Sequence, residues 1–568
     1  MKKTISCSHV SFLERGCDWV EAAVLAQQPK RSGMQKDWVN MDIVGDTQPC
    51  SMNWCNIEQW RYIPPPENVI LLTQKDEMKQ DVIEAKYKEV EKLERYGTFE
   101  VLPFQGQETI SSRWVITQRE VDGKKLIKAR LVARGFEEDA RSAEIRTDSP
   151  TCKRFSLRLV LITASTYKWK INSLDVASAF LQSNEIEREV FLCPPADICS
   201  SESVWKLKRP IYGLCDAPRS WYDTMSAFLV SIGGVKSAID DAMFMWFEKS
   251  KLIGHLACHV DDVNYTGTNK WNKTVIKAVK EKFNISSEAE GSYKYIGLNI
   301  LQGRHAITID QSTYITSLEE IPLSKERQKQ KDDLLNKEEK SKLRSLSGQM
   351  LWVTTQTRPD FAYEACRMSN VGKSPTVRMI IEANKAVKHL KSSAFDVRLA
   401  FPHLGDPTEF KLMAYSDASH NSLPGNASQG AFIVFVCGDK RAAPLIWQSR
   451  KLRRVTKSPL ASETSAFGEA ADAGKLMGAL LKEVYNLPEL PKFVCHTDSK
   501  SLFDAACTSN TVEDKSMTLE MSRVREMVSL KELSVKWISK DDMVADVMTK
   551  RGASYDLLRK VLIDSQLH

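Results

Sequence analysis

The sequence lacks the features that would place it in a membrane or an oxidising compartment. Its longest apolar run is about that of 431–437, far short of the roughly 18–20 residues of a membrane-spanning helix. The first residues, MKKTISCSHVSFLERG, have neither the apolar core nor the cleavage site of a secretion signal. The 13 cysteines form no CxxC pair, which is typical of reduced thiols. We therefore expect a cytoplasmic or nuclear protein.

A strong excess of either charge is also lacking, as are internal repeats and low-complexity tracts. Lys and Arg number 80 against 73 Asp and Glu, a formal net charge of +7. This balance is compatible with a polyanionic partner but does not require one. The 568 residues are 42% hydrophobic and 27% charged, which is typical of a globular chain with three or four domains of roughly 150 residues each.

The order of hydrophobic patterns predicts a mixed α+β, multidomain protein. Short alternating stretches in 17–60 favour a small β-barrel, and the prolines at 64–66 favour a boundary. The pattern of 74–96 predicts a helix that stops at Gly97. The remaining segments, in order, are alternating strands and helices at 110–310, a charged surface helix pair or linker at 317–345, and a second alternating region at 410–550.

Three aspartates stand in apolar surroundings in the first half of the chain. Asp175 lies in the apolar segment 170–176, and Asp261 and Asp262 interrupt two strand-like runs, HLACHV and VNYTG. The pair is therefore expected at the tip of a β-hairpin. Adjacent aspartates repel each other and are costly to bury, and a divalent cation such as Mg²⁺ removes that conflict. A polar hairpin turn without a metal explains the pair equally well.

Four more acidic residues are spread over the C-terminal region. Asp417 ends the strand-like FKLMAYSD, and Asp498 closes another apolar strand, KFVCHTD. Glu463 lies in the first turns of a helix that Ser458 could cap, and Asp546 lies in a segment expected to form a C-terminal helix. The four carboxylates could converge on a metal site, although each taken singly is more typical of a cap or a surface charge.

Ordered motifs then give a resemblance that covers most of the chain. RWVITQREVDGKKLIKARLVARGFEE, LDVASAFLQ, LKRPIYGLCDAPRSWY, HVDDVNYTG, YIGLNI and LRSLSGQMLWVTTQTRPDFAY follow one another between 113 and 363. Together they closely resemble the reverse transcriptase of copia-type retrotransposons. AYSDAS, LASETSAFGEA, CHTDSKSLFDA and MVADVMTKR resemble the RNase H domain of the same elements. The resemblance implies a right-hand polymerase with fingers, palm and thumb, followed by an RNase H-like α/β domain.

Through the polymerase resemblance, Asp175, Asp261 and Asp262 match the metal-binding triad of that family, and Val176 matches a backbone contact to the metal. Further positions match nucleotide-binding residues of the family: Lys128, Arg130, Phe180, Tyr212 and Gly213. The cations would contact the triphosphate, and the Phe180 ring would exclude a ribose 2′-hydroxyl. Alternatives remain open, because the cations could lie on a solvated hairpin face and the phenylalanine could belong to the core.

The RNase H resemblance implies that Asp417, Glu463, Asp498 and Asp546 bind metal and that the RNA strand of an RNA–DNA hybrid is cut. A basic segment would contact backbone phosphates through Arg450, Lys451, Arg453 and Arg454, although a solvated basic loop explains it nearly as well. Two Mg²⁺ ions are expected at each active site, with Mn²⁺ as a substitute.

The resemblance also predicts how the chain is divided and what it works with. The expected parts are an integrase C-terminal-like small β-barrel and linker at 1–66, fingers and palm at 67–316, a thumb or connection region at 317–408, and an RNase H-like domain at 409–568. No integrase core, capsid or protease segment is recognised in the sequence, so we expect a piece of a longer polyprotein or a truncated product.

The expected partners are an RNA template, a DNA primer, dNTPs and RNA–DNA hybrid, with no membrane. Association with itself or with other element proteins in a cytoplasmic virus-like particle or ribonucleoprotein is also expected, as is access to the nucleus. The predicted function is RNA-directed DNA synthesis coupled to RNase H cleavage. The alternative is a decayed or co-opted relic that binds nucleic acid without turnover.

Overall fold

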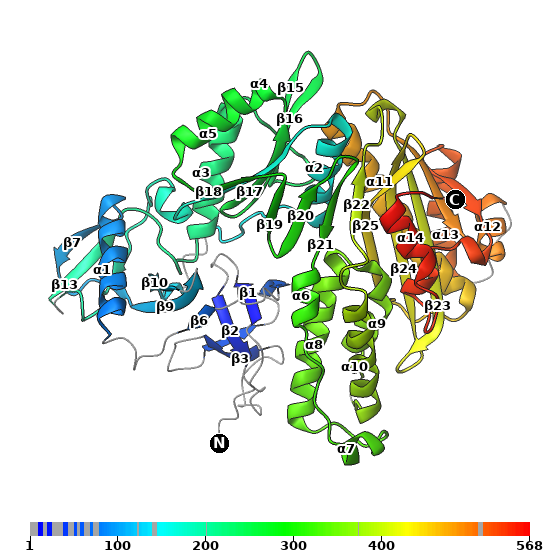
Figure 1. Ribbon diagram of the computed structural model, residues 1–568, viewed down its shortest axis with the longest axis horizontal. Helices are drawn as coiled ribbons and strands as arrows, with labels where there is room; N and C mark the ends of the chain where they lie inside the picture. Colours follow the sequence, from blue (N-terminus) through cyan, green and yellow to red (C-terminus); the bar gives the residue numbers. More distant parts are fainter. Residues whose placement is uncertain are drawn as a thin grey trace.

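The computed structural model mixes helices and strands throughout the residues it describes, which confirms the expected α+β class (Figure 1). It describes residues 79–121, 124–138, 145–199, 202–372, 374–508 and 515–567, together with six strands between residues 10 and 71. Among these residues, no helix is both long and apolar enough to cross a bilayer.

The N-terminal strands form one antiparallel sheet. Its order is β4-β3-β2-β1-β5, and its members are β1 (Val10–Glu14), β2 (Val20–Val24), β3 (Trp38–Ile43), β4 (Cys50–Asn53) and β5 (Ile57–Arg61). Among the described pairings, β4 and β5 stay at the two edges. The expected strands are therefore present, but the described residues form an open sheet rather than a closed barrel.

The next unit is a long hairpin covered by a helix. β9 (Ser112–Val121) pairs in antiparallel register with β10 (Lys124–Ala133), and β6 (Val69–Leu71) pairs with β9. Helix α1 (Gln80–Arg95) buries Val82, Val90 and Leu93 on the face that packs toward β10. The predicted helix and its stop are confirmed, since Gly97 follows with φ +60°, which glycine adopts without steric cost.

A six-stranded antiparallel sheet lies at the centre of the first half (Figure 1). In order its strands are β14 (Val235–Lys236), β15 (Met243–Glu248), β16 (Lys251–His259), β17 (Asp262–Gly267), β11 (Ile171–Val176) and β18 (Ile285–Glu290). Side chains alternate between its faces. Phe244 and Trp246 share a core with helix α3 (Ala217–Ser231), whereas Met243 and Met245 share one with helix α2 (Arg154–Tyr167).

The charged segment after residue 317 forms helices that build a core of their own. Helices α8 (Lys337–Gln356), α9 (Ala362–Ser369) and α10 (Val377–Ser392) pack together through a shared apolar cluster. Asn336 caps α8, and the Glu339 side chain bonds back to the Asn336 backbone, so the start of the helix is fixed in sequence. The chain then returns as β22 (Leu399–Pro402), which pairs with β21 (Ala306–Asp310).

The C-terminal unit is a five-stranded mixed sheet with helices beside it. Its order is β25-β24-β23-β26-β27, built from β23 (Lys411–Leu423), β24 (Ala427–Gly438), β25 (Arg441–Lys451), β26 (Lys492–Thr497) and β27 (Ser534–Trp537). The first three strands form an antiparallel meander, whereas β26 runs parallel to β23. The long helix α11 (Pro459–Tyr485) connects β25 to β26 and packs on the sheet.

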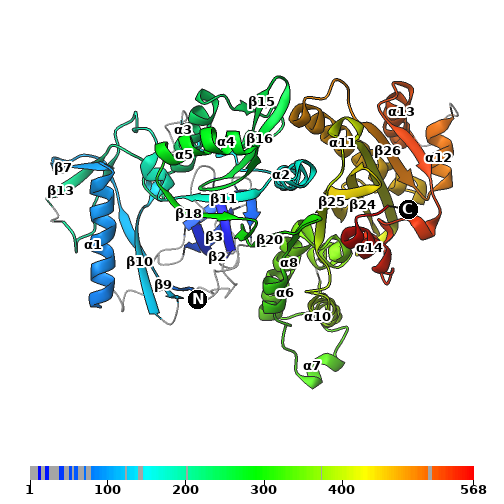
Figure 2. The same ribbon diagram turned by 45° about the horizontal axis from the view of Figure 1, so that its top comes forward.

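Helix α2 joins the central sheet to the C-terminal sheet in one continuous core (Figure 2). Its side chains are buried along almost the whole length because sheets lie on both sides. Arg158, 3% exposed, donates from Nη1 to the Leu445 carbonyl at 2.9 Å and stacks its guanidinium 3.6 Å from the Trp447 ring centroid. The two halves of the chain are therefore packed together as neighbours in a single interior.

Candidate active sites

Strand register brings the first group of aspartates together. Asp175 on β11 lies directly opposite Asp262 at the start of β17, and His259 and Asp262 close the β16–β17 hairpin. Asp261 lies in the turn of this hairpin, as the sequence predicted, and its carbonyl accepts a hydrogen bond from the Val176 amide at 3.0 Å. Backbone pairing therefore sets the positions of all three carboxylates.

The turn that carries Asp261 is strained. Val260 has φ +58°, a left-handed conformation that costs a β-branched residue about 1–3 kcal/mol. The Val260 carbonyl accepts a hydrogen bond from Trp221 Nε1 at 2.8 Å, which ties the turn to helix α3. Because this two-residue turn is held in place, the position of the Asp261 backbone is fixed.

Burial and mutual repulsion dominate the electrostatics of this group. Burial, reinforced by Asp175, raises the pKa of Asp261 to about 6. Burial, reinforced by Asp261 and Asp175, raises the pKa of Asp262 to about 7. The Ser286 hydroxyl donates to Asp175 Oδ2, a contact for which the sequence gave no signal. Crowded carboxylates of this kind suit a hard divalent ion, although within the described chain their oxygens are less convergent than those of the second group.

Two cations lie on β10 near these aspartates. Arg130 and Lys128 both lower the pKa of Asp261, against the larger effect of burial. The Arg130 guanidinium lies 5.4 Å from the Tyr212 ring centroid, and its Nε is buried without a hydrogen-bond partner. The Lys128 side chain is exposed by surface area, but neighbouring residues partly desolvate its ammonium, and this desolvation together with repulsion from Arg130 lowers its pKa. An anion between the strand and the aspartates would satisfy these donors.

Phe180 and the loop around Gly213 lie beside Arg130. The Phe180 side chain is 3% exposed and packs edge-on against Tyr212, with ring centroids 5.3 Å apart. Gly213 has φ +89°, and a Cβ there would lie 2.0 Å from the Ala133 carbonyl oxygen, so only glycine lets the loop approach β10. Phe180 therefore belongs to the core in this structure, while Tyr212 separates it from Arg130.

The second group converges on one point from three elements. Asp417 lies on β23, Glu463 in the first turns of α11, and Asp498 directly after β26. One carboxylate oxygen from each lies within 4.8 Å of the others, the arrangement expected for metal ligands. The predicted cap is also present, since Ser458 accepts the Ala461 amide at the start of α11.

This second group has an unsatisfied acceptor at its centre. Glu463 Oε2 is buried and has no hydrogen-bond partner. Burial, reinforced by Asp417 and Asp498, raises the pKa of Glu463 to about 9. Burial also raises the pKa of Asp417, to about 6, against the effect of Lys550. A buried, unpaired carboxylate oxygen among other carboxylates is the environment that a divalent cation neutralises, so the residues present fit such an ion.

Asp546 reaches this group differently from the way the sequence suggested. It begins η9 (Asp546–Met548), a single 3₁₀ turn, and not the expected C-terminal helix. The helix forms later, as α14 (Asp556–Asp564), after a separate turn that contains Gly552 at φ +74°. Lys550 donates to Asp417 Oδ1 at 3.0 Å and also to Asp546 Oδ1. Sequence reasoning assigned Lys550 no role, although its spacing of four from Asp546 was a usable signal.

Part of the chain matches a known protein family. Residues 96–329 match the family described as "Reverse transcriptase (RNA-dependent DNA polymerase)". The chain is 26% identical to the Retrovirus-related Pol polyprotein from transposon RE2 of Arabidopsis thaliana, over 80% of this chain and 32% of that protein. It is 26% identical to the TNT 1-94 polyprotein of Nicotiana tabacum, over 83% of this chain and 37% of that protein. The chain is therefore similar to the reverse transcriptase region of copia/Ty1-type Pol polyproteins.

The chain spans about a third of the length of these curated relatives. A truncated transposon Ty1-A Gag-Pol polyprotein of Saccharomyces cerevisiae is 24% identical, over 83% of this chain and 41% of that protein. Solved structures with similar parts include a foamy viral protease-reverse transcriptase in complex with dsDNA, at 12% identity, a TM-score of 0.24 and 81% coverage of each chain. An LC11-RNase H1 in complex with RNA/DNA hybrid aligns at 12% identity and a TM-score of 0.19, over 23% of this chain and 88% of that one.

The basic segment at the end of β25 is only partly available to a ligand. Arg450 makes a two-point ion pair with Glu469, at 2.6 and 3.1 Å. Arg454 lies 3.8 Å from Glu520 and is 77% exposed, and Lys451 and Arg453 are exposed at the end of β25. The exposed members of the segment are therefore better placed to contact phosphate than Arg450 is.

Proposed function

We propose that this chain synthesises DNA on an RNA template and cleaves the RNA of RNA–DNA hybrids at a second site. The proposed polymerase comprises residues 67–316, with the β9–β10 hairpin as fingers and the six-stranded sheet as palm. The proposed thumb or connection is 317–408, and the proposed nuclease is the RNase H-like domain 409–568. The N-terminal residues 1–66 would be the integrase-derived remnant.

The observation that carries the polymerase proposal is the register of Asp175 opposite Asp262, with Asp261 held in the adjoining turn. Asp175, Asp261 and Asp262 would hold the divalent ions, with Val176 beside them. Arg130 and Lys128 would bind the triphosphate, because they lie close enough to lower the pKa of Asp261. Tyr212 and Gly213 would shape the nucleotide pocket, with Phe180 behind them.

The convergence of Asp417, Glu463 and Asp498 supports the nuclease proposal, and Asp546 would complete the ligand set. Two Mg²⁺ ions, or Mn²⁺, at each site would activate the attacking hydroxyl or water and stabilise charge on the leaving oxygen when bound. Phosphates of the hybrid would meet Lys451, Arg453 and Arg454, with Arg450 joining only if its pair with Glu469 opens. A preserved ligand set favours an enzyme over the decayed relic.

Primer extension on a poly-rA template with Mg²⁺ or Mn²⁺, run beside cleavage of a labelled RNA–DNA hybrid, tests the proposal. Both activities are expected, and both should disappear when EDTA removes the divalent ion. A folded protein that binds hybrid but neither extends primers nor cleaves RNA would favour the relic. Work within a cytoplasmic particle with other element proteins is a further part of the proposal, which copurification with element RNA would test.

A further inference from the structure

Lys550 occupies an unusual position in the C-terminal carboxylate group. Its ammonium donates to Asp417 Oδ1 at 3.0 Å and to Asp546 Oδ1, so it lies between two of the four acidic residues. The remaining oxygen of Asp417 accepts the Thr549 hydroxyl. Glu463 Oε2, by contrast, is buried and unpartnered. One side of the group is therefore neutralised by the chain itself, while the other side is left for an external cation.

The convergent oxygens divide in the same way. Asp417, Glu463 and Asp498 meet within 4.8 Å, and Asp546 is not part of that set within the described residues. Asp546 instead shares the Lys550 ammonium with Asp417. An ammonium is a compact point charge that interacts with carboxylates much as a small hard cation does. Two cations cannot occupy the same position, because their repulsion is large where water is scarce.

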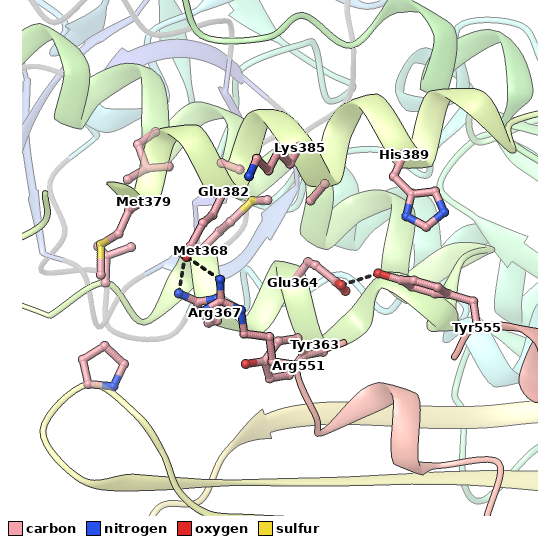
Figure 3. Close-up of a pocket in the computed structure, with 15 residues that line it drawn as sticks. Tyr363, Glu364, Arg367, Met368, Met379, Glu382, Lys385, His389, Arg551 and Tyr555 are labelled. Atoms are coloured by element: carbon pink, nitrogen blue, oxygen red, sulfur yellow. Dashed lines mark hydrogen bonds and ion pairs between the residues drawn. The ribbon is translucent and has the colours of Figure 1, made fainter. Parts of the chain in front are cut away.

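The backbone that carries Lys550 is held from both sides. Its amide donates to the Asp546 carbonyl at 3.0 Å. The next residue, Arg551, donates to Glu382 of α10 at 2.8 Å, and Tyr555 donates its hydroxyl to Glu364 of α9 at 2.5 Å. These residues line a cavity of about 210 Å³ (Figure 3). The Lys550 side chain itself is 29% exposed, so the ammonium can rotate toward solvent without moving the backbone.

We propose that Lys550 holds the cation position between Asp417 and Asp546 in the free protein and that a second divalent ion must displace it. The first ion would bind Asp417, Glu463 and Asp498. The displaced ammonium would turn toward a phosphate of the bound hybrid, which attracts lysine strongly. Lys550 is then a positioning residue that delays full metal loading until nucleic acid arrives. This inference rests on the proposed nuclease function.

Manganese binding to the full chain tests the inference without measuring activity. Asp261→Asn and Asp262→Asn are included in every form so that the palm carboxylates contribute little to the titration. The parent is expected to bind a second Mn²⁺ at the C-terminal site at least tenfold more weakly than the first, by calorimetry or by paramagnetic resonance. Lys550→Met should tighten the second ion at least tenfold, whereas Lys550→Arg and the exposed control Lys482→Met should behave as the parent.

Adding Asp546→Asn to Lys550→Met should return the second ion to weak binding, because the vacated position loses a ligand. If Lys550→Met misfolds by circular dichroism, Lys550→Gln replaces it with the same expectation. Equal affinity for the second ion in the parent and in Lys550→Met or Lys550→Gln would overturn the inference alone. Ion binding that is unchanged by Asp417→Asn would instead overturn the proposed metal site. In hybrid cleavage, Lys550→Met should lower the half-saturating Mg²⁺ concentration, and an unchanged or raised value would count against the inference.

Discussion

The two carboxylate groups are assembled in opposite ways. The palm group uses neighbouring strands, with Asp175 and Asp262 paired across a ladder and Asp261 in a strained turn. The C-terminal group gathers Asp417, Glu463 and Asp498 from a strand, a helix and the end of another strand. A register error of one residue would therefore destroy the first group, whereas the second depends on how a helix packs against its sheet.

The cations near the two groups differ as well. Arg130 and Lys128 lie on a separate hairpin and lower the pKa of Asp261 through space. An incoming triphosphate could bind these two cations. Lys550 makes direct contact with two carboxylates of its own group. Under the proposed function, the cations near the palm group remain available to the substrate, whereas Lys550 partly neutralises the C-terminal group.

The largest effects are expected when one carboxylate of either group is replaced and both activities are measured for each variant. Asp261→Asn should reduce DNA synthesis about 100-fold or more and leave hybrid cleavage intact, because charge stabilisation at one transition state is lost. Asp498→Asn should do the reverse. Primer extension and cleavage of a labelled hybrid measure the two activities, with exposed Asp396→Asn as the control. Loss of both activities from either single change in a folded protein would show that the groups are not independent.

A second large effect concerns the core that the two regions share. Arg158→Met should lower the free energy of unfolding by about 2–4 kcal/mol, because the carbonyls of Leu445 and Thr355 lose buried donors. Urea denaturation measures the change, with exposed Arg378→Met as the matched control. Unfolding that remains a single transition would support one interior shared by both regions. An effect no larger than that of the control would mean that Arg158 contributes little to the junction.

The pH dependence of stability should distinguish the groups in the absence of metal. A raised carboxyl pKa means that the folded protein binds more protons than the unfolded chain, so stability falls as pH rises through the folded pKa. For Asp262, with a pKa of about 7, the fall begins above the unfolded value near 4 and ends near pH 7. For Glu463, with a pKa of about 9, it continues into the alkaline range.

Melting temperatures recorded from pH 5 to 9 in EDTA test this pattern. Asp262→Asn should flatten the pH dependence up to about pH 7, and Glu463→Gln should flatten it up to about pH 9, each change corresponding to roughly 1–2 kcal/mol of unfolding free energy. Added Mn²⁺ should raise the melting temperature most where the carboxylates are ionised. A slope that neither substitution alters would show that other groups control the acid–base stability of the protein.

Much of this arrangement could be predicted from the sequence, but not its long-range contacts. Apolar runs on both sides of Asp261 and Asp262 predicted the hairpin. The pairing that brings Asp175 opposite Asp262 joins residues far apart in the sequence, and only the family resemblance indicated it. The contact between Lys550 and Asp417 joins residues 133 apart, and no local pattern encodes it. The same is true of Asp546, whose segment reads as a helix but is held in a 3₁₀ turn by its tertiary contacts.

The smallest effect is expected at the proposed nucleotide pocket of the first group. Phe180→Val should reduce discrimination against ribonucleotides about tenfold, because a smaller side chain behind Tyr212 lets that ring move away from a 2′-hydroxyl. The ratio of kcat/KM for dNTP and rNTP measures it, with Tyr212→Phe as the control that keeps the ring. Hybrid cleavage should not change, since the nuclease residues lie on other elements. An unchanged ratio with lower thermal stability would assign Phe180, 3% exposed, to core packing alone.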